Sequence, residues 1–448
     1  MPIPAATQRR AAGRSRILQT SPAKASTPGS GHYRLWLSKF IRREAERGRV
    51  QPGENSFMKD RTLLMIPGPI EFEPAVLAAL GAPTTSHLAP DFIEAFGQAL
   101  EKTRQVFLSD DGQPFVLAGS GTLAMDTAVA NLIEPGDKAL VVNTGFFSDR
   151  MALILERYGA QVTHVTAPVG GRPAIEEVEA ALQQDHFKVL TITHVDTSTA
   201  VIADVKAMAG LAQQYGALSI VDGVCSVAGE ELRMSEWGVD VALTASQKAI
   251  SVPPGLALVV ASPRAMQAFK RRKTPVLSYY SDWANWLPIM EAYEARRPAY
   301  FGTPAVNLVF ALNVSLDQIQ KEGLAARFKR HLALGAAVQA ALNALELEQV
   351  PLKEEFAAHT LSAPRYPRGV TPADLLPKVQ KAGVTLAGGL HPAIRAEYFR
   401  IGHMGPATSG DVLATIGAVE TALQQCGYAF TAGAGVAAAQ AAYQQAMA

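Results

Sequence analysis

Between Phe115 and Ser262, short runs of apolar and β-branched residues alternate with amphipathic stretches of helical periodicity. Runs of this kind are typical of parallel strands that are buried on both faces. The predicted strands are Phe115–Ala118, Lys138–Asn143, Gln161–Thr166, Val189–His194, Leu218–Asp222, Val239–Thr244 and Leu256–Ala261. The alternation predicts an α/β fold with a mostly parallel, seven-stranded sheet that is covered by helices on both faces.

Helices are predicted between these strands, for example at Leu123–Leu132, Asp149–Tyr158, Ile175–Gln183 and Ala203–Tyr215. Only a short loop precedes the last strand, which leaves no room for a helical crossover, so this strand is expected to be antiparallel. Parallel open sheets bind ligands at the carboxyl ends of their strands, and the candidate site residues are therefore those that follow the strands.

The length of 448 residues is too great for one hydrophobic core and suits two domains. A long helical stretch with a break from Ala305 to about Leu345, followed by short strands, predicts a smaller C-terminal α+β domain. The expected parts are a disordered basic extension (1–57), an N-terminal arm (58–80), a large domain (81–310), a small domain (311–430) and an Ala-rich tail (431–448).

The charge of the chain is unevenly distributed. Residues 1–43 contain nine Lys or Arg and no Asp or Glu. The rest of the chain contains the other 32 Lys and Arg and all 40 Asp and Glu, so its net charge is −8. The basic segment fits a mitochondrial targeting segment, and it fits equally a disordered extension ahead of an alternative start at Met58. Mitochondrial, cytoplasmic and peroxisomal locations stay open, and the composition leans towards the first. The acidic remainder argues against nucleic acid binding.

Cysteine content and hydropathy exclude further classes. Cys225 and Cys426 are the only cysteines, which excludes a disulfide framework or a multi-cysteine metal site. No apolar run approaches the roughly 18 residues that a membrane-spanning helix needs.

Two predicted strands end near residues of opposite charge. Asp222 ends one strand, and Lys248 follows the next strand after a few residues. Because desolvation lowers the pKa of an amine, a lysine at the end of a buried strand is a candidate nucleophile. A lysine that can form an imine and an aspartate that can keep a pyridine nitrogen protonated are what pyridoxal 5′-phosphate (PLP) chemistry needs.

A glycine- and hydroxyl-rich turn supplies a phosphate site. Ser120, Gly121 and Thr122 leave one predicted strand and open a helix, where free N–H groups and the helix dipole favour an anion. The spacing Gly119-x-Gly121-x-x-Ala124 also matches a dinucleotide fingerprint. Against that alternative, the next strand ends in Asn143 rather than in an acid that could bind a ribose.

Residues after two further strands suit the cofactor ring. Phe147 is expected to stack on the pyridine, although Phe146 and Phe147 both also fit a hydrophobic core. The run Val195 to Thr199 offers hydroxyls to the phenolic oxygen, and helix capping by Ser198 or Thr199 is the simpler alternative. His194 is more often structural than catalytic in such a position.

Several segments together resemble the class V aminotransferases, and more narrowly the fungal branch of the alanine–glyoxylate (serine–pyruvate) aminotransferases. The resemblance covers about Leu63 to Gln424 and rests on residues 194–199, 221–226, 245–249, 300–304, 387–390 and 400–405, which match in the same order. It implies the PLP-dependent transferase fold of type I.

The resemblance also implies roles for individual residues. Lys248 would bind PLP covalently and act as the catalytic base, and Asp222 would pair with the pyridine nitrogen. Thr197 would bond the phenolic oxygen, and Phe147 would stack on the ring. The phosphate would be bound by Ser120, Gly121, Thr122 and Gln247.

Substrate and partner roles follow from the same resemblance. Arg400 would bind the substrate carboxylate as a bidentate pair. Tyr300 and Thr303 would reach the phosphate of a neighbouring subunit, which implies a homodimer with shared active sites. Gly68, within Pro67-Gly68-Pro69, would lie at the active-site mouth, and a simple chain reversal explains these residues equally well.

The predicted function is a ping-pong transamination from L-alanine or L-serine to glyoxylate, with glycine and pyruvate or hydroxypyruvate as products. Within the cofactor class, the alternatives are a cysteine desulfurase, for which neither cysteine is suitably placed, and a transaminase for phosphonates or phosphorylated amino acids. The basic run Lys270 to Lys273 would serve the latter, although such runs are usually solvated. A dinucleotide-dependent oxidoreductase and an inactive binding protein are the alternatives from other classes.

Overall fold

The computed structural model describes residues 62–448, so the predicted basic extension and its targeting role lie outside the described residues. The centre is a seven-stranded sheet with the order β2-β10-β9-β8-β5-β3-β4. Its strands are β2 (Gln113–Gly119), β3 (Lys138–Asn143), β4 (Gln161–Thr166), β5 (Val189–Thr193), β8 (Leu218–Asp222), β9 (Val241–Ala245) and β10 (Gly255–Ala261). Only β10 runs antiparallel to its neighbours, which confirms the predicted α/β architecture.

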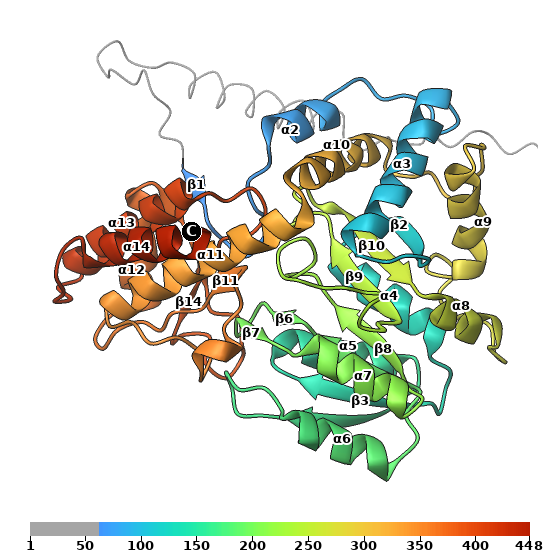
Figure 1. The fold of residues 1–448 in the computed structure, drawn as a ribbon, viewed down its shortest axis with the longest axis horizontal. Helices are drawn as coiled ribbons and strands as arrows, with labels where there is room; N and C mark the ends of the chain where they lie inside the picture. The colour runs from blue at the N-terminus through green and yellow to red at the C-terminus, as the bar shows by residue number, and fades with distance from the viewer. Residues whose placement is uncertain (1–61) are drawn as a thin grey trace, which may run out of the picture. The chain divides into compact units, whose positions relative to one another are not determined.

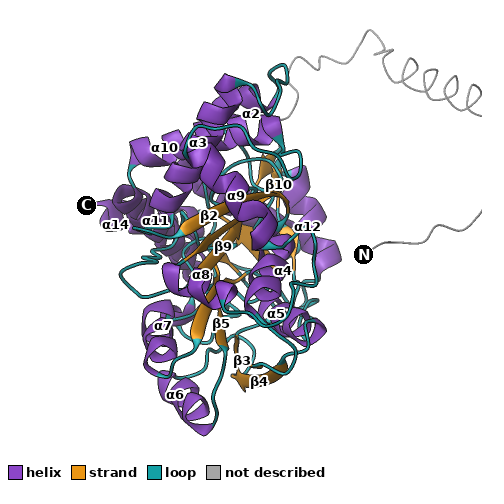
Figure 2. Cartoon of the chain, turned by 90° about the vertical axis from the view of Figure 1, so that its right-hand side faces the viewer, coloured by secondary structure: helices purple, strands orange, loops and turns teal. Residues whose placement is uncertain are grey.

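Helices cover both faces of this sheet, with α4 and α5 on one side and α6 and α7 on the other (Figure 2). The helices of the large domain are α2 (Pro74–Leu80), α3 (Pro90–Val106), α4 (Gly121–Leu132), α5 (Phe146–Arg157), α6 (Ile175–Gln184), α7 (Val205–Gln214), α8 (Pro263–Lys270), α9 (Trp283–Glu294) and α10 (Val306–Glu322). A small hairpin, β6 (Val195–Asp196) with β7 (Val201–Ile202), follows β5. The strands are almost fully buried except at the edge strand β4, as expected for a sheet packed on both faces.

The remaining elements form a second hydrophobic core beside the first (Figure 1). They are α11 (Leu324–Ala344), a 3₁₀ turn at Glu354–Phe356, α12 (Pro372–Lys381), α13 (Ser409–Gln425) and α14 (Ala434–Met447), with strands β11 (Leu361–Ser362), β12 (Val384–Thr385), β13 (Ala387–Gly388) and β14 (Phe399–Gly402). The sheet order is β11-β14-β13, and the N-terminal strand β1 (Leu63–Leu64) pairs in parallel with β12. The described part of the predicted arm, residues 62–80, is thereby attached to the small domain at β1 and Met65.

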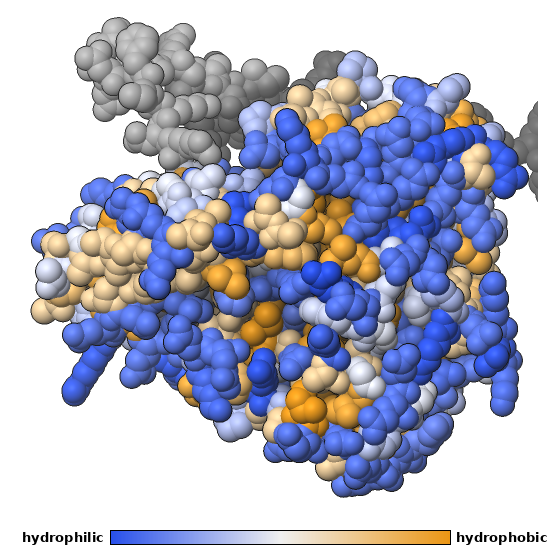
Figure 3. Space-filling model, in the orientation of Figure 1, coloured by the Kyte–Doolittle hydropathy of each residue, from blue (hydrophilic) through white to orange (hydrophobic). Residues whose placement is uncertain are grey.

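One domain boundary differs from the sequence-based expectation, and the C-terminal tail takes part in packing. The predicted boundary at 310/311 falls inside α10, whose buried Leu312, Leu316 and Ile319 belong to the core of the large domain. The chain leaves that domain at Gly323, where φ is +81° and the helix is interrupted. The tail 431–448, to which the sequence assigned no role, forms α14 on α11 with Ala439 fully buried. Its outer face is weakly apolar in Figure 3, and the exposed side chains of α14 include Ala437 and Ala441.

Local ends also differ. Helix α5 begins at Phe146 rather than at the predicted Asp149, and β5 ends at Thr193 rather than at His194. Within residues 62–448, no helix combines the length and hydropathy needed to cross a membrane.

Candidate active site

The carboxyl ends of β2, β3, β5, β8 and β9 meet at one edge of the sheet because these strands run in the same direction. Asp222 is the last residue of β8, and Lys248 lies in the turn that follows β9. Most of the predicted site residues follow these five strand ends. Their convergence is a direct consequence of the topology.

Lys248 is almost completely buried, with 8% of its surface exposed. Its Nζ donates a hydrogen bond to the carbonyl oxygen of Pro67. Gly68 has a φ of +113°, and a Cβ at this position would lie 2.6 Å from Nζ of Lys248. The structure therefore places the arm directly over the lysine, where only glycine leaves room for the amine.

Asp222 is 3% exposed, and its Oδ1 accepts a hydrogen bond from Val224 N at 3.0 Å. Burial raises the pKa of this carboxyl to about 6, helped by the charge of Asp196 and opposed by the Val224 bond and by the cations Arg150 and Lys248. A buried carboxylate of this kind gains a large free energy from a cationic partner. The site therefore fits a protonated pyridine nitrogen.

The turn before α4 can bind a phosphate. Ser120 is the N-cap residue of α4, but its hydroxyl makes no capping bond, so the N–H groups of the first turn lack a side-chain partner from the cap. Arg150 Nη1 donates to Thr122 Oγ1 at 2.9 Å and brings a cation to the same turn. A Cβ on Gly121 would lie 2.9 Å from Val224, so the turn packs closely against the loop after Asp222.

Gln247 adds an unsatisfied polar group near this turn. Its Oε1 is buried and has no hydrogen-bond partner within residues 62–448. Buried amide oxygens are normally hydrogen-bonded, so this one calls for a donor such as a water molecule. The uncapped helix and the buried Asp222 together fit PLP, and Gln247 would donate to the phosphate through Nε2, since its Oε1 is an acceptor like the phosphate oxygens.

A residue that the sequence analysis did not single out organises the start of α5. Asp196 is fully buried, and its carboxylate accepts hydrogen bonds from Phe147 N at 3.1 Å and Ser148 N at 3.4 Å. Ser198 Oγ donates to Asp196 at 2.6 Å and accepts from Phe146 N at 3.0 Å. Ser198 thus satisfies the first N–H group of α5 from 52 positions away, whereas the helix that follows the hydroxyl-rich run, α7, is capped by Asp204 and not by Ser198 or Thr199.

The Phe147 ring lies at this capped helix start. The guanidinium carbon of Arg150 lies 4.7 Å from the centroid of that ring, and Phe146 packs edge-on at 5.4 Å. Arg150 therefore contacts both the phosphate turn and the predicted stacking residue. Nothing in the spacing of the sequence indicated this role, because an arginine at a helix start is usually solvated.

Thr197 and Arg400 are brought together from opposite domains. Arg400 Nη1 donates to the carbonyl oxygen of Thr197 at 3.2 Å, and its Nε donates to Gly388 O at 2.9 Å. No salt bridge to Arg400 exists within the described part of the chain. The hydroxyl of Thr197 lies 2.8 Å from Sγ of Cys225, a fully buried thiol. Arg400 is thus oriented by two carbonyl oxygens and keeps donors for a carboxylate.

Three further residues named in the sequence analysis lie apart from this cluster. Tyr300 and Thr303 lie in the exposed connection between α9 and α10, with the Tyr300 ring 5.3 Å from that of His87. They do not join the site of their own chain. His194 is buried behind the sheet edge, and burial lowers its pKa to about 4, so it stays neutral at physiological pH.

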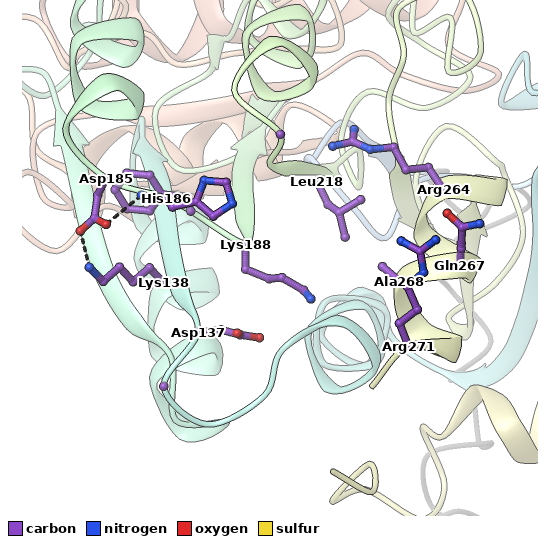
Figure 4. Close-up of a pocket in the computed structure, with 13 residues that line it drawn as sticks. Asp137, Lys138, Asp185, His186, Lys188, Leu218, Arg264, Gln267, Ala268 and Arg271 are labelled. Carbon is purple, nitrogen blue, oxygen red and sulfur yellow. Dashed lines mark hydrogen bonds and ion pairs between the residues drawn. The ribbon is translucent and has the colours of Figure 1, made fainter. Parts of the chain in front are cut away.

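A cavity of about 730 Å³ lies at the opposite edge of the sheet, at the amino ends of β3, β5 and β8 (Figure 4). Two of its cations are already paired, Lys138 with Asp185 at 2.5 Å and Arg264 with Asp240 at 2.8 Å. Arg271, from the basic run after α8, lines this cavity and not the edge that holds Lys248. The cavity is therefore separate from the candidate active site.

Comparison with known proteins gives the family. The profile described as aminotransferase class-V matches residues 76–406 of the 448. The chain belongs to the class V aminotransferases. Alanine–glyoxylate aminotransferase 1 of Saccharomyces cerevisiae is 43% identical over 355 residues, which are 76% of this chain and 91% of the yeast protein. Serine–glyoxylate aminotransferase of Arabidopsis thaliana is 33% identical over 84% of this chain and 94% of the plant protein.

The solved structures agree with this assignment. The ureidoglycine–glyoxylate aminotransferase of Bacillus subtilis superposes with a TM-score of 0.81 and 26% identity, covering 87% of this chain and 100% of that one. The class V aminotransferase is therefore a PLP-dependent enzyme of fold type I, as the resemblance implied.

Proposed function

We propose that this class V aminotransferase transfers the amino group of L-alanine or L-serine to glyoxylate. The observation that carries the proposal is the acceptor shared by the relatives. The yeast, plant and Bacillus proteins are named for glyoxylate but for three different donors, namely alanine, serine and ureidoglycine. The products would be glycine and pyruvate or hydroxypyruvate.

The chemistry assigned to the chain's own residues follows from their positions. PLP supplies an electron sink that stabilises negative charge at the substrate Cα. Lys248 would hold the cofactor and move the proton at Cα, because it is the buried amine at the end of β9. Asp222 would hold the proton on the pyridine nitrogen. The Gly68 segment, which packs on Lys248, would exclude water from the amine.

The remaining contacts would bind the cofactor and substrate. Ser120, Gly121, Thr122 and Gln247 would hold the phosphate, Phe147 would stack on the ring, and Thr197 would bond the phenolic oxygen. Arg400 would bind the carboxylate of each substrate in turn, because donor and acceptor share that group. Since the amino group stays on the enzyme between the two half-reactions, ping-pong kinetics are expected.

The proposal includes a homodimer. Tyr300 and Thr303 are exposed, and Leu277 and Tyr279 in the preceding connection are 70% and 77% exposed. Exposed aromatic and aliphatic side chains in one region are typical of an interface. In the dimer, Tyr300 and Thr303 would reach the phosphate of the other subunit.

Donor specificity is tested with steady-state kinetics. The account predicts parallel double-reciprocal lines with alanine or serine against glyoxylate, and no turnover by Lys248→Ala. Phosphoserine is the comparison donor for the phosphorylated-substrate alternative, which is disfavoured because Arg271 lies at the opposite edge of the sheet. Intersecting lines, or faster turnover with phosphoserine than with alanine and serine, would contradict the proposal.

A further inference from the structure

Tyr398 lies between the two domains with its side chain fully buried. Its hydroxyl accepts hydrogen bonds from Leu390 N at 2.8 Å and His391 N at 2.9 Å, both in the loop between β13 and β14. The same hydroxyl donates to the carbonyl oxygen of Ser198 in the large domain. A hydroxyl has one donor and two acceptor positions, so this one is fully used.

These partners surround Arg400. Tyr398 immediately precedes β14, and Arg400 lies two residues later, so extended geometry places both side chains on the same face. Tyr398 bonds the carbonyl of Ser198, and Arg400 bonds the carbonyl of the preceding residue, Thr197. The second carbonyl oxygen that accepts a hydrogen bond from Arg400 belongs to Gly388, the last residue of β13. The loop that starts after Gly388 is the one that Tyr398 holds through its N–H groups.

We infer that Tyr398 is a positioning residue that fixes the guanidinium of Arg400 for the substrate carboxylate. Its hydroxyl holds both segments whose carbonyls orient Arg400, the Thr197–Ser198 segment on one side and the β13–β14 loop on the other. The inference rests on the proposed role of Arg400 in carboxylate binding. Because both substrates carry a carboxylate, Tyr398 affects both half-reactions.

The domains have other contacts that do not involve this hydroxyl. Ala358 N donates to Ala200 O at 2.9 Å, and Thr360 Oγ1 donates to Cys225 O at 2.7 Å. His359 Nδ1 lies 2.9 Å from Glu230. Removing the Tyr398 hydroxyl therefore leaves the domains attached and mainly releases the two segments beside Arg400.

The chain offers a matched control in the same domain. Tyr366 Oη is buried without a hydrogen-bond partner within the described residues, and its ring lies 5.3 Å from that of Phe399. Tyr366→Phe makes the same chemical change next to the same strand. Unlike Tyr398→Phe, it leaves no N–H or carbonyl group unpaired.

The experiment compares the holoenzymes of wild type, Tyr398→Phe, Tyr366→Phe, Arg400→Gln and the double variant Tyr398→Phe/Arg400→Gln. We expect Tyr398→Phe to raise the KM of donor and acceptor about tenfold, with kcat changed by less than about threefold, because one buried and two partly buried main-chain groups lose a partner. Tyr366→Phe should match wild type. In the Arg400→Gln background, Tyr398→Phe should have no further effect on kcat/KM.

A binding measurement provides a readout independent of turnover. Glycolate, a carboxylate with no amino or keto group, is titrated calorimetrically into each variant, and the same tenfold weakening is expected for Tyr398→Phe and not for Tyr366→Phe. Absence of transamination by wild type, or normal glycolate binding by Arg400→Gln, would refute the proposed function instead. Tyr398→Phe behaving like Tyr366→Phe, lowering only kcat, adding its effect to Arg400→Gln, or failing to fold would overturn the role of Tyr398.

Discussion

Replacement of Asp222 by Asn should stabilise the enzyme once its cofactor has been removed. The carboxyl of Asp222 is buried at the end of β8, where its pKa rises to about 6 from an ordinary value of 3.8. Asn fills nearly the same volume and keeps an oxygen for the hydrogen bond from Val224 N. The variant therefore removes the cost of a buried charge without creating a cavity.

The magnitude follows from the shift in pKa. A folded-state pKa above the unfolded value means that ionisation opposes folding, so the wild type loses stability as the pH rises from about 3.8 to about 6. About two pKa units at about 1.4 kcal/mol each give a penalty of about 3 kcal/mol, which is constant above pH 6. The Asp222→Asn variant would not carry this penalty, because its amide does not ionise.

The assay is urea unfolding of the apo-proteins at several pH values. We expect apo-Asp222→Asn to exceed apo-wild type by about 3 kcal/mol at pH 8 and the difference to vanish near pH 3.5. The control is Asp185→Asn, because the hydrogen bond from Lys138 lowers the pKa of Asp185, so this change should not stabilise the protein. An apo-Asp222→Asn variant no more stable than wild type at pH 8, or equally stabilised at every pH, would refute the reasoning.

Three further predictions concern the segment that packs on Lys248, the contact between the two domains at His359, and the start of the C-terminal helix α14. Gly68→Ala should lower kcat/KM about tenfold or more, because its φ of +113° is unfavourable for alanine and its Cβ would lie 2.6 Å from the Lys248 amine. The melting temperature of the wild type should fall as the pH rises above 6.5, and that of His359→Gln should not show this fall. Burial lowers the pKa of His359, but the charge and bonds of Glu230 outweigh it and raise the pKa, so the pair stabilises the fold below that range. Glu420→Ala should cost about 1–3 kcal/mol in urea unfolding, because its carboxylate accepts bonds from three N–H groups at the start of α14.

Two of these have a control variant, and the third has an outcome that would contradict it. Gly81→Ala should be active, since Gly81 has an ordinary helical φ of −82° and its added Cβ meets nothing closer than 3.4 Å. A wild type whose stability is flat from pH 6 to 9 would contradict the His359 prediction. Thr421→Ala, at an exposed neighbour of Glu420, should leave the free energy of unfolding unchanged. Equal losses of stability in Thr421→Ala and Glu420→Ala would contradict the role of Glu420 at the start of α14.

The central sheet could be predicted from sequence because its strands are continuous apolar runs separated by turn residues. All seven predicted strands of this sheet agree with the structure within two residues at each end, and the short loop before β10 gave its antiparallel direction. The ends were less accurate where distant side chains decide them. Helix α5 begins early because Asp196, distant in sequence, accepts the N–H groups of Phe147 and Ser148.

The domain boundary and the tail were harder for related reasons. The periodicity of α10 and α11 is nearly continuous, so sequence did not show that the core changes at Gly323. The alanines of α14 give little amphipathic contrast, and small side chains pack on α11 without a marked apolar stripe.

For the site, the predictable residues are those that follow strand ends with recognisable chemistry. Lys248 and Asp222 are examples. Residues that act through others were missed. Arg150, Asp196 and Tyr398 act through contacts across 28, 49 and 200 positions of the sequence, respectively, and no local spacing encodes such contacts.

The central claim is that Lys248 binds the cofactor covalently. The enzyme is purified with PLP, reduced with borohydride and digested, and the modified peptide is located by mass spectrometry. The account predicts a single pyridoxyl group on Lys248 and none on the Lys248→Ala variant. A pyridoxyl group on another lysine, or an unmodified Lys248 in a protein that still transaminates, would contradict it.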